Sequence, residues 1–124
     1  MYEYRAVVEK VLDGDSVRVS ADLGFSVSIS IIARLTGLNA RELSQPGGKE
    51  ARTELTRLLP PGTVVVLQSV AHDKYSGRCA AYLIKPGETT TINDQLIADG
   101  WAAPWNGKGP RPLPDWLRAE TPDR

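Results

Sequence analysis

Residues 25–31 limit the possible folds more than any other part of the sequence. Serines alternate there with four apolar residues that would share one face of a strand, Phe25, Val27, Ile29 and Ile31. The adjacent Ile31 and Ile32 interrupt this period of two, which predicts a bulge or sharp bend just before Arg34. A strand with one apolar face needs neighbouring strands, so we expect a sheet protein.

Two further pairs of segments predict β-hairpins. The alternating residues 4–12 and 17–19 flank Asp13-Gly14-Asp15, and Asp-Gly is a strong hairpin-turn signal. The β-branched run 63–70 and residues 79–84 flank a polar link in the same way. Together with residues 25–31, these segments give five expected strands.

Two helices are expected between and after these strands. In the first, Ala51, Leu55, Leu58 and Leu59 share one face, and Pro60 follows. The second covers residues 92–97, where Thr91 or Asn93 would cap its start and Gly100 would end it. Three strands, a helix, two strands and a helix predict an α+β, mainly β fold, a five-stranded OB-type barrel with two to three helices.

The length of 124 residues fits one domain. We expect residues 1–105 to form it, with residues 106–124 as a proline- and tryptophan-containing tail packed on it or extending from it. We see no signal peptide, and no apolar run approaches the roughly 20 residues of a membrane span. Since the lone Cys79 also excludes an internal disulfide, we expect a cytoplasmic monomer without a membrane partner.

Charge and residue types narrow the chemistry. Fifteen basic residues balance fifteen acidic ones, so a polyanion would have to be held by locally grouped arginines and lysines. His72 is the only histidine, which excludes catalysis by a histidine pair, and we take it as a surface residue. Cys79 has no partner for thiol chemistry in the sequence pattern, and we take it as a small packed side chain.

Several oxygen-bearing residues could bind a hard cation such as Ca²⁺. Asp15 would offer a carboxylate from the first hairpin, with Asn39 and the Ala40 carbonyl as further oxygen ligands. The alternative is that Asp15 and Asn39 only shape turns. One carboxylate alone would bind calcium weakly. Whether a calcium site forms therefore depends on the oxygens of Asn39 and Ala40.

Two arginines and a glutamate could act on a phosphate. The guanidinium groups of Arg34 and Arg78 could hold one phosphate and stabilise the extra charge of its transition state. Alternatively, each arginine only packs its stem along the sheet. Glu42 could accept the proton of an attacking water, or it could simply be a solvated surface residue.

Four segments together resemble the staphylococcal nuclease (thermonuclease-like) family of OB-fold nucleases. The resemblance covers about residues 4–105. It rests on residues 11–17 (VLDGDSV), 34–42 (RLTGLNARE), 73–78 (DKYSGR) and 92–102 (INDQLIADGWA). Their order and spacing are more specific than any one motif.

The resemblance implies a Ca²⁺-dependent nuclease that hydrolyses DNA or RNA, most readily single-stranded, with little sequence preference and 3′-phosphorylated products. It implies Asp15 as a calcium ligand, Arg34 and Arg78 as phosphate clamps and Glu42 as the base. It further implies that Lys74 and Tyr75 contact a terminal phosphate or neighbouring nucleotide, and that Trp105 borders a base pocket.

The sequence also departs from the family pattern. Asn39 replaces the family's second aspartate ligand, which should weaken calcium binding or loosen the choice of metal, and Ala40 and Arg41 replace a threonine and a proline. Arg41 could add a phosphate contact. One extra residue precedes Arg78. The alternative function is therefore a catalytically weak OB module that binds single-stranded nucleic acid or a protein partner.

Overall fold

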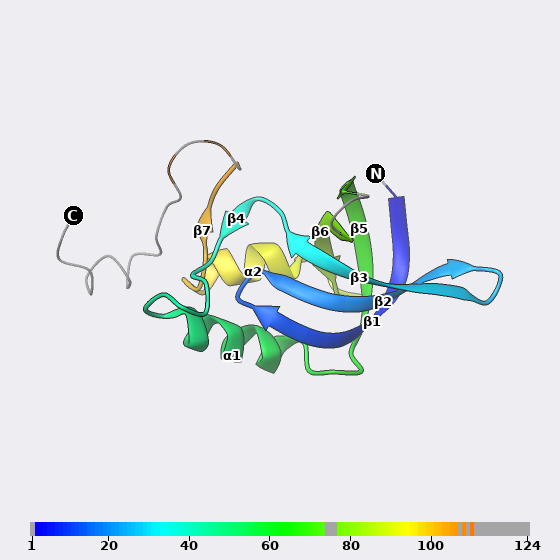
Figure 1. Ribbon diagram of the computed structural model, residues 1–124, viewed down its shortest axis with the longest axis horizontal. Coiled ribbons are helices and arrows are strands. Elements are labelled where there is room, and N and C mark those ends of the chain that lie inside the picture. Colours follow the sequence, from blue (N-terminus) through cyan, green and yellow to red (C-terminus); the bar gives the residue numbers. More distant parts are fainter. Residues whose placement is uncertain (1, 74–76, 107, 109, 111–124) are drawn as a thin grey trace.

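The computed structural model describes residues 2–73, 77–106, 108 and 110. Five strands close into a barrel in the order β1–β2–β3–β6–β5 (Figure 1). They are β1 (Tyr2–Asp13), β2 (Ser16–Gly24), β3 (Val27–Leu35), β5 (Val64–Asp73) and β6 (Arg78–Ile84). Of the barrel pairs only β3 and β6 are parallel, while the others are antiparallel. With a helix after the third strand, this is the predicted OB-type barrel.

Helix α1 (Gly48–Leu58) packs against β1, and its buried side chains are those that the apolar spacing predicted, Ala51, Leu55 and Leu58. Helix α2 (Ile92–Ala98) begins at Thr91, whose hydroxyl accepts the backbone N–H of Asp94 at 3.1 Å. It ends before Gly100, which has a φ of 83° and so supplies the left-handed residue expected there. Neither helix has the length and hydropathy needed to cross a membrane.

The core fills the barrel and the space between the barrel and the helices. Alternate residues of every barrel strand point inwards, and Leu55, Leu59, Ile92 and Leu96 complete the core from the helical segments. Trp101 packs against this core, as expected. Cys79 is a buried core residue, and burial raises the pKa of its thiol. A buried thiol with a raised pKa is a poor nucleophile, so the packed reading of Cys79 is confirmed.

Two details of β3 differ from the prediction. Phe25 is not part of the strand, because Phe25 and Ser26 form a two-residue turn with φ values of 54° and 60°. Such primed turns match the twist of a hairpin, and the alternation of apolar residues and serines continues through the turn and conceals it. The bulge expected near Ile32 is also absent from β3, since Ile32 lies on the outer face and keeps the register, while the irregularity lies in β2 between Asp22 and Gly24.

Two short strands were not expected. β4 (Leu38–Asn39) pairs antiparallel with β7 (Ala103–Pro104), on the side of the molecule away from the β2–β3 hairpin (Figure 1). Two-residue strands carry no detectable period, so sequence patterns do not reveal them. This pair fixes the segment that contains Asn39, and the backbone N–H of Trp105 donates to Gly37 O at 2.9 Å beside it.

Candidate functional site

The turn between β1 and β2 packs closely against two other segments. Gly14 and Asp15 form this turn, and the Asp15 backbone N–H donates to Asp13 Oδ1 at 3.0 Å. A Cβ atom on Gly14 would lie 2.8 Å from the Cβ of Ala51 in α1 and 3.0 Å from the Cβ of Ala40. Glycine is therefore needed here for space, and its close packing holds Asp15 beside the segment that follows β4.

Asp15 is a buried carboxyl group, only 8% exposed. Burial raises the pKa of this carboxyl most, and the hydrogen bond and negative charge of Asp13 also raise it. Arg34 and the backbone N–H of Ala40 act in the opposite direction, and the pKa rises in all from 3.8 to about 7. These contacts show that Asp15, Arg34 and Ala40 lie together. Leu35 N–H also donates to Asp15 O at 2.8 Å, which ties the turn to the end of β3.

Arg34 on β3 and Arg78 on β6 lie on the same outer face of the barrel. The strands run parallel, with Arg34 opposite Ala80 and Arg78 opposite Ile32. The neighbouring residues Ala33, Leu35 and Cys79 are buried in the barrel. Since successive side chains of a strand alternate in direction, both arginine side chains leave the backbone on the outer face. Strand spacing and rise separate their Cα atoms by about 8 Å. Long side chains can close that separation over one phosphate group.

Glu42 lies on an exposed loop between β4 and α1. Gln45 holds the backbone of this residue, because Glu42 N–H donates to Gln45 Oε1 at 3.0 Å and Gln45 N–H donates to Glu42 O at 2.9 Å. A Cβ atom on Gly48 would lie 1.8 Å from Glu42 O. The loop therefore closes on the first residue of α1. Beside it, Arg41 is half-buried, and its Nε has no hydrogen-bond partner among the described residues.

A cavity of about 310 Å³ adjoins Arg34 on the outer face of the barrel. Tyr82, two residues beyond Ala80 on β6, and the half-buried Trp105 contribute aromatic rings to its walls. Trp105 Nε1 donates to Lys108 O at 2.9 Å. Trp105 thus lies beside Arg34, whereas Lys74 and Tyr75, the other two expected nucleotide contacts, fall outside the described residues.

The oxygen donors near Asp15 have the chemistry of a hard-cation site. Carboxylate and carbonyl oxygens suit Ca²⁺, and Asp13 and Asp15 form an acidic pair whose charge a cation would compensate. Asn39 is buried, and it directly precedes Ala40, whose backbone N–H contacts the Asp15 carboxyl group. Among the residues that the structure describes, no three His, Cys, Asp or Glu side chains gather into a metal cluster. A cation here would depend on neutral oxygens for much of its coordination.

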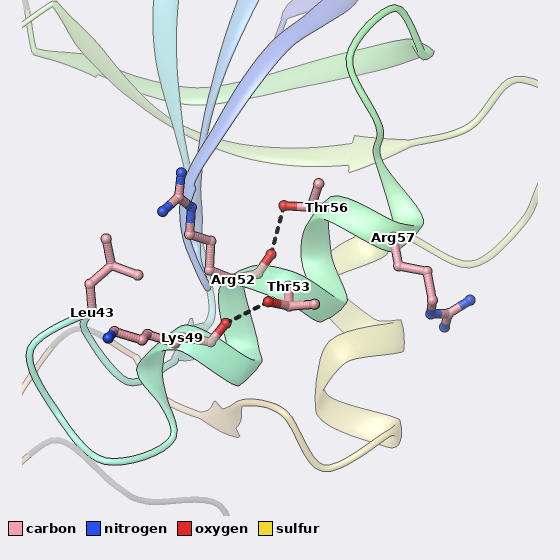
Figure 2. A pocket seen from close by; sticks show the side chains of 6 residues that line it. All are labelled: Leu43, Lys49, Arg52, Thr53, Thr56 and Arg57. Carbon is pink, nitrogen blue, oxygen red and sulfur yellow. Dashed lines mark hydrogen bonds between the residues drawn. The ribbon is translucent and has the colours of Figure 1, made fainter.

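A second positively charged surface lies on α1. Lys49, Arg52 and two threonines line an open groove of about 690 Å³ next to Leu43 (Figure 2). The threonine hydroxyls of this groove donate to backbone carbonyls one turn earlier. Arg57, which points away from Lys49 and Arg52 in Figure 2, forms an ion pair with Glu54. Within the described ranges, Lys49 and Arg52 have no such carboxylate partner.

Sequence reasoning missed two residues of this region. The Asp-Gly pattern predicts only a turn role for Asp13, yet its carboxyl group contacts that of Asp15. No motif of the sequence includes Tyr82, although its period of two with Arg78 and Ala80 places it on the same outer face. Comparison with protein-family models finds none that matches this chain, and comparison with curated proteins finds no match either.

Proposed function

We propose that this chain hydrolyses phosphodiester bonds of DNA or RNA at the surface that carries Arg34, Arg78 and Glu42. The parallel register of β3 and β6 is the observation that supports this most, because it brings two arginines to one outer face. Asp15 beside Arg34 adds a carboxyl group at the same end of β3. A glutamate as the third member of this set favours an enzyme, since a carboxylate beside the phosphate would repel a ligand that is only to be bound.

In this proposal the two guanidinium groups hold the non-bridging phosphate oxygens and stabilise the charge that develops on them. Glu42 accepts a proton from a water molecule as the water oxygen attacks phosphorus. The bond from phosphorus to the 5′ oxygen breaks, and this oxygen takes a proton from solvent and leaves as a 5′-hydroxyl, so the other product carries a 3′-phosphate. Tyr82 and Trp105 border the cavity next to Arg34, where a base could lie on an aromatic ring.

Asp15, Asn39 and the Ala40 carbonyl would hold Ca²⁺ in this proposal, with Asp13 adding negative charge. The bound cation would neutralise charge on the phosphate next to the arginines. The acidic pair and the neutral oxygens fit this ion in kind. Their low total charge predicts weaker binding than a site with a second aspartate at residue 39 would give.

The second candidate is binding of single-stranded nucleic acid without cleavage. The aromatic cavity beside Arg34 favours this alternative. Bases that stack on aromatic rings, with the Arg34 guanidinium near the phosphate, are sufficient for binding. In that case the small number of carboxylates around Asp15 would not matter, because no cleavage would take place.

The proposal is tested by incubating the protein with single-stranded DNA, plasmid DNA and RNA, each with Ca²⁺ or with chelator. Glu42→Gln and Arg34→Lys keep the size or charge of the side chain, and each should lower the cleavage rate about 10²- to 10³-fold. Arg57→Lys is the matched control, because Arg57 already pairs with Glu54. Cleavage that persists in chelator or in both site variants contradicts the mechanism, and tight binding without cleavage supports the second candidate.

A further inference from the structure

The open groove on α1 begins at the loop that carries Glu42. Gln45 N–H donates to Glu42 O at 2.9 Å and closes a tight turn, and Leu43, which lies inside this turn, lines the groove. A Cβ atom on Gly48 would lie 1.8 Å from Glu42 O. Standard bond lengths then place the Cα of the next residue, Lys49, within about 7 Å of that oxygen. The groove therefore starts directly beside the residue proposed as the base.

The helical period sorts the charges of α1 onto two flanks. Residues three or four positions apart share one side of a helix. One flank carries the side chains that line the groove next to Leu43, which are Lys49, Arg52, Thr53 and Thr56. The other flank carries both acidic residues of the helix and the arginine that pairs with one of them, which are Glu50, Glu54 and Arg57. Among the described residues that line the groove none is acidic, so the positive charges of Lys49 and Arg52 dominate it.

The hydroxyl groups of the groove are already used as donors. Thr53 Oγ1 donates to Lys49 O at 2.9 Å, and Thr56 Oγ1 donates to Arg52 O at 2.8 Å (Figure 2). A hydroxyl group has one hydrogen, so neither threonine can also donate to a ligand while it makes this bond. The side-chain donors that remain are the Lys49 ammonium and the Arg52 guanidinium. The groove therefore suits an anionic ligand.

The groove is much larger than a single small anion needs. Its volume of about 690 Å³ lies within the roughly 300–1,000 Å³ of sites for drug-sized ligands, whereas one water molecule takes about 30 Å³. Leu43, which is 37% exposed, adds an apolar wall. Cations along one side and an apolar wall on the other fit a polynucleotide, because its phosphates can meet the cations while a sugar or base packs on the leucine.

We propose that the α1 groove holds phosphates of the same nucleic-acid strand that reaches Glu42, so that the substrate is a polynucleotide bound well beyond the bond that breaks. This inference rests on the proposed nuclease activity, which brings a strand to Glu42. Lys49 and Arg52 are about 4.5 Å apart along the helix axis, and their long side chains can contact neighbouring phosphates. An acidic peptide would match the charge of the groove but would not explain its position beside Glu42.

The first test measures binding in chelator, where the proposed cleavage stops. Fluorescence anisotropy gives the Kd of a labelled oligo-dT of about 12 nucleotides, a length within the range that one OB-type barrel covers. Lys49→Gln and Arg52→Gln should each weaken binding roughly 2- to 5-fold, and the double variant roughly 4- to 25-fold. Arg57→Gln is the matched control, since this arginine lies on the same helix and already pairs with Glu54, and it should bind as the wild type does.

The second test measures cleavage of the same oligomer with Ca²⁺. The double variant should raise KM by about the factor by which it weakens binding and leave kcat unchanged, because the groove holds the strand away from the bond that breaks. Glu42→Gln should instead lower kcat. This contrast separates binding of the strand from the chemical step.

The two proposals fail in different ways. If the wild type binds the oligomer without cleaving it, the nuclease activity is wrong, and the binding series alone decides whether the groove holds nucleic acid. If the wild type cleaves the oligomer and the folded double variant binds and cleaves it equally well, the groove inference is overturned and the nuclease activity stands. Variants that lose binding of a polyglutamate peptide but keep that of the oligomer also overturn it.

A further variant keeps the test decisive if Arg52→Gln fails to fold, which circular dichroism would reveal, since Arg52 is half-buried. Lys49 is exposed, so Lys49→Glu should fold. Reversing this charge should weaken binding of the oligomer more than Lys49→Gln does. Unchanged binding by a folded Lys49→Glu variant overturns the inference.

Discussion

Asp15 favours its neutral form in the folded protein, because burial and Asp13 raise its pKa from 3.8 to about 7. When the folded pKa exceeds the unfolded one, the stabilising contribution is complete below pH 3.8 and is lost as the pH rises through about 7. The shift corresponds to about 4 kcal/mol. In chelator, Asp15→Asn should therefore raise the free energy of unfolding at pH 8 by about 2–4 kcal/mol and change it little near pH 4.

Urea unfolding followed by tryptophan fluorescence between pH 4 and pH 8 checks this prediction. The exposed Asp99 provides the control, since Asp99→Asn makes the same chemical change at the surface and removes no buried carboxyl group. An equal gain for Asp15→Asn at pH 4 and pH 8 would show that burial of its charge is not the cause. Excess Ca²⁺ should stabilise the wild-type protein and leave Asp15→Asn nearly unchanged.

Gly48 is needed for space rather than for backbone conformation. It is absent from the glycines with positive φ, but an added Cβ atom would lie 1.8 Å from Glu42 O. Gly87 is the converse case, with a φ of 82° and nothing within 4 Å of its added Cβ. Gly87→Ala should cost about 1 kcal/mol of unfolding free energy, and Gly48→Ala about 2 kcal/mol or more. Equal losses in chemical denaturation would rule out the contact with Glu42 as the reason for glycine.

At the scale of secondary-structure elements, Asn93 attaches α2 to the barrel. Its buried side chain accepts Leu83 N–H at 3.2 Å and donates to Ala81 O at 3.0 Å and to Thr36 O at 2.9 Å. Leu83 and Ala81 lie on β6, while Thr36 lies in the turn between β3 and β4. Asn93 therefore connects α2 to the turn that separates Arg34 from Asn39.

Asn93→Ala should lower the free energy of unfolding by about 2–4 kcal/mol, because it leaves buried backbone groups without partners. Thr91→Ala removes one exposed helix cap on the same element and should cost about 1 kcal/mol. Thermal and urea unfolding of both variants measures the difference. If Thr91→Ala lowers the free energy of unfolding more than Asn93→Ala, α2 is stabilised mainly by its N-terminal cap and not by the Asn93 hydrogen bonds to the barrel.

At the scale of the whole molecule, neutral net charge limits how strongly nucleic acid is attracted from a distance. Binding should depend on the few cations that touch phosphates, each of which adds about 0.7 to the slope of log K against log salt for a single strand. If the strand crosses α1, Lys49→Ala with Arg52→Ala should reduce the slope by about 1.4. Arg57→Ala should leave it unchanged, because Arg57 pairs with Glu54. Binding titrations at increasing salt measure this slope. If the double variant keeps the full slope, the nucleic-acid strand does not cross α1.

The sequence predicted much of the fold because the relevant signals are local. Strand alternation, the Asp13-Gly14 turn, the apolar face of α1 and the Thr91 and Gly100 ends of α2 each depend on a few neighbouring residues. The same local signals misplaced Phe25, because a two-residue turn can lie within an unbroken alternation of apolar residues and serines. They also missed β4 and β7, which are too short to show a period.

The sequence by itself therefore determined the five barrel strands and the two helices, their order, and which residues had the chemistry to act on a phosphate. Only the tertiary structure decided which of those residues meet. The parallel pairing of β3 with β6 aligns Arg34 and Arg78, and burial beside Asp13 changes the acidity of Asp15. Register and burial arise from contacts between distant segments, and local patterns do not encode such contacts.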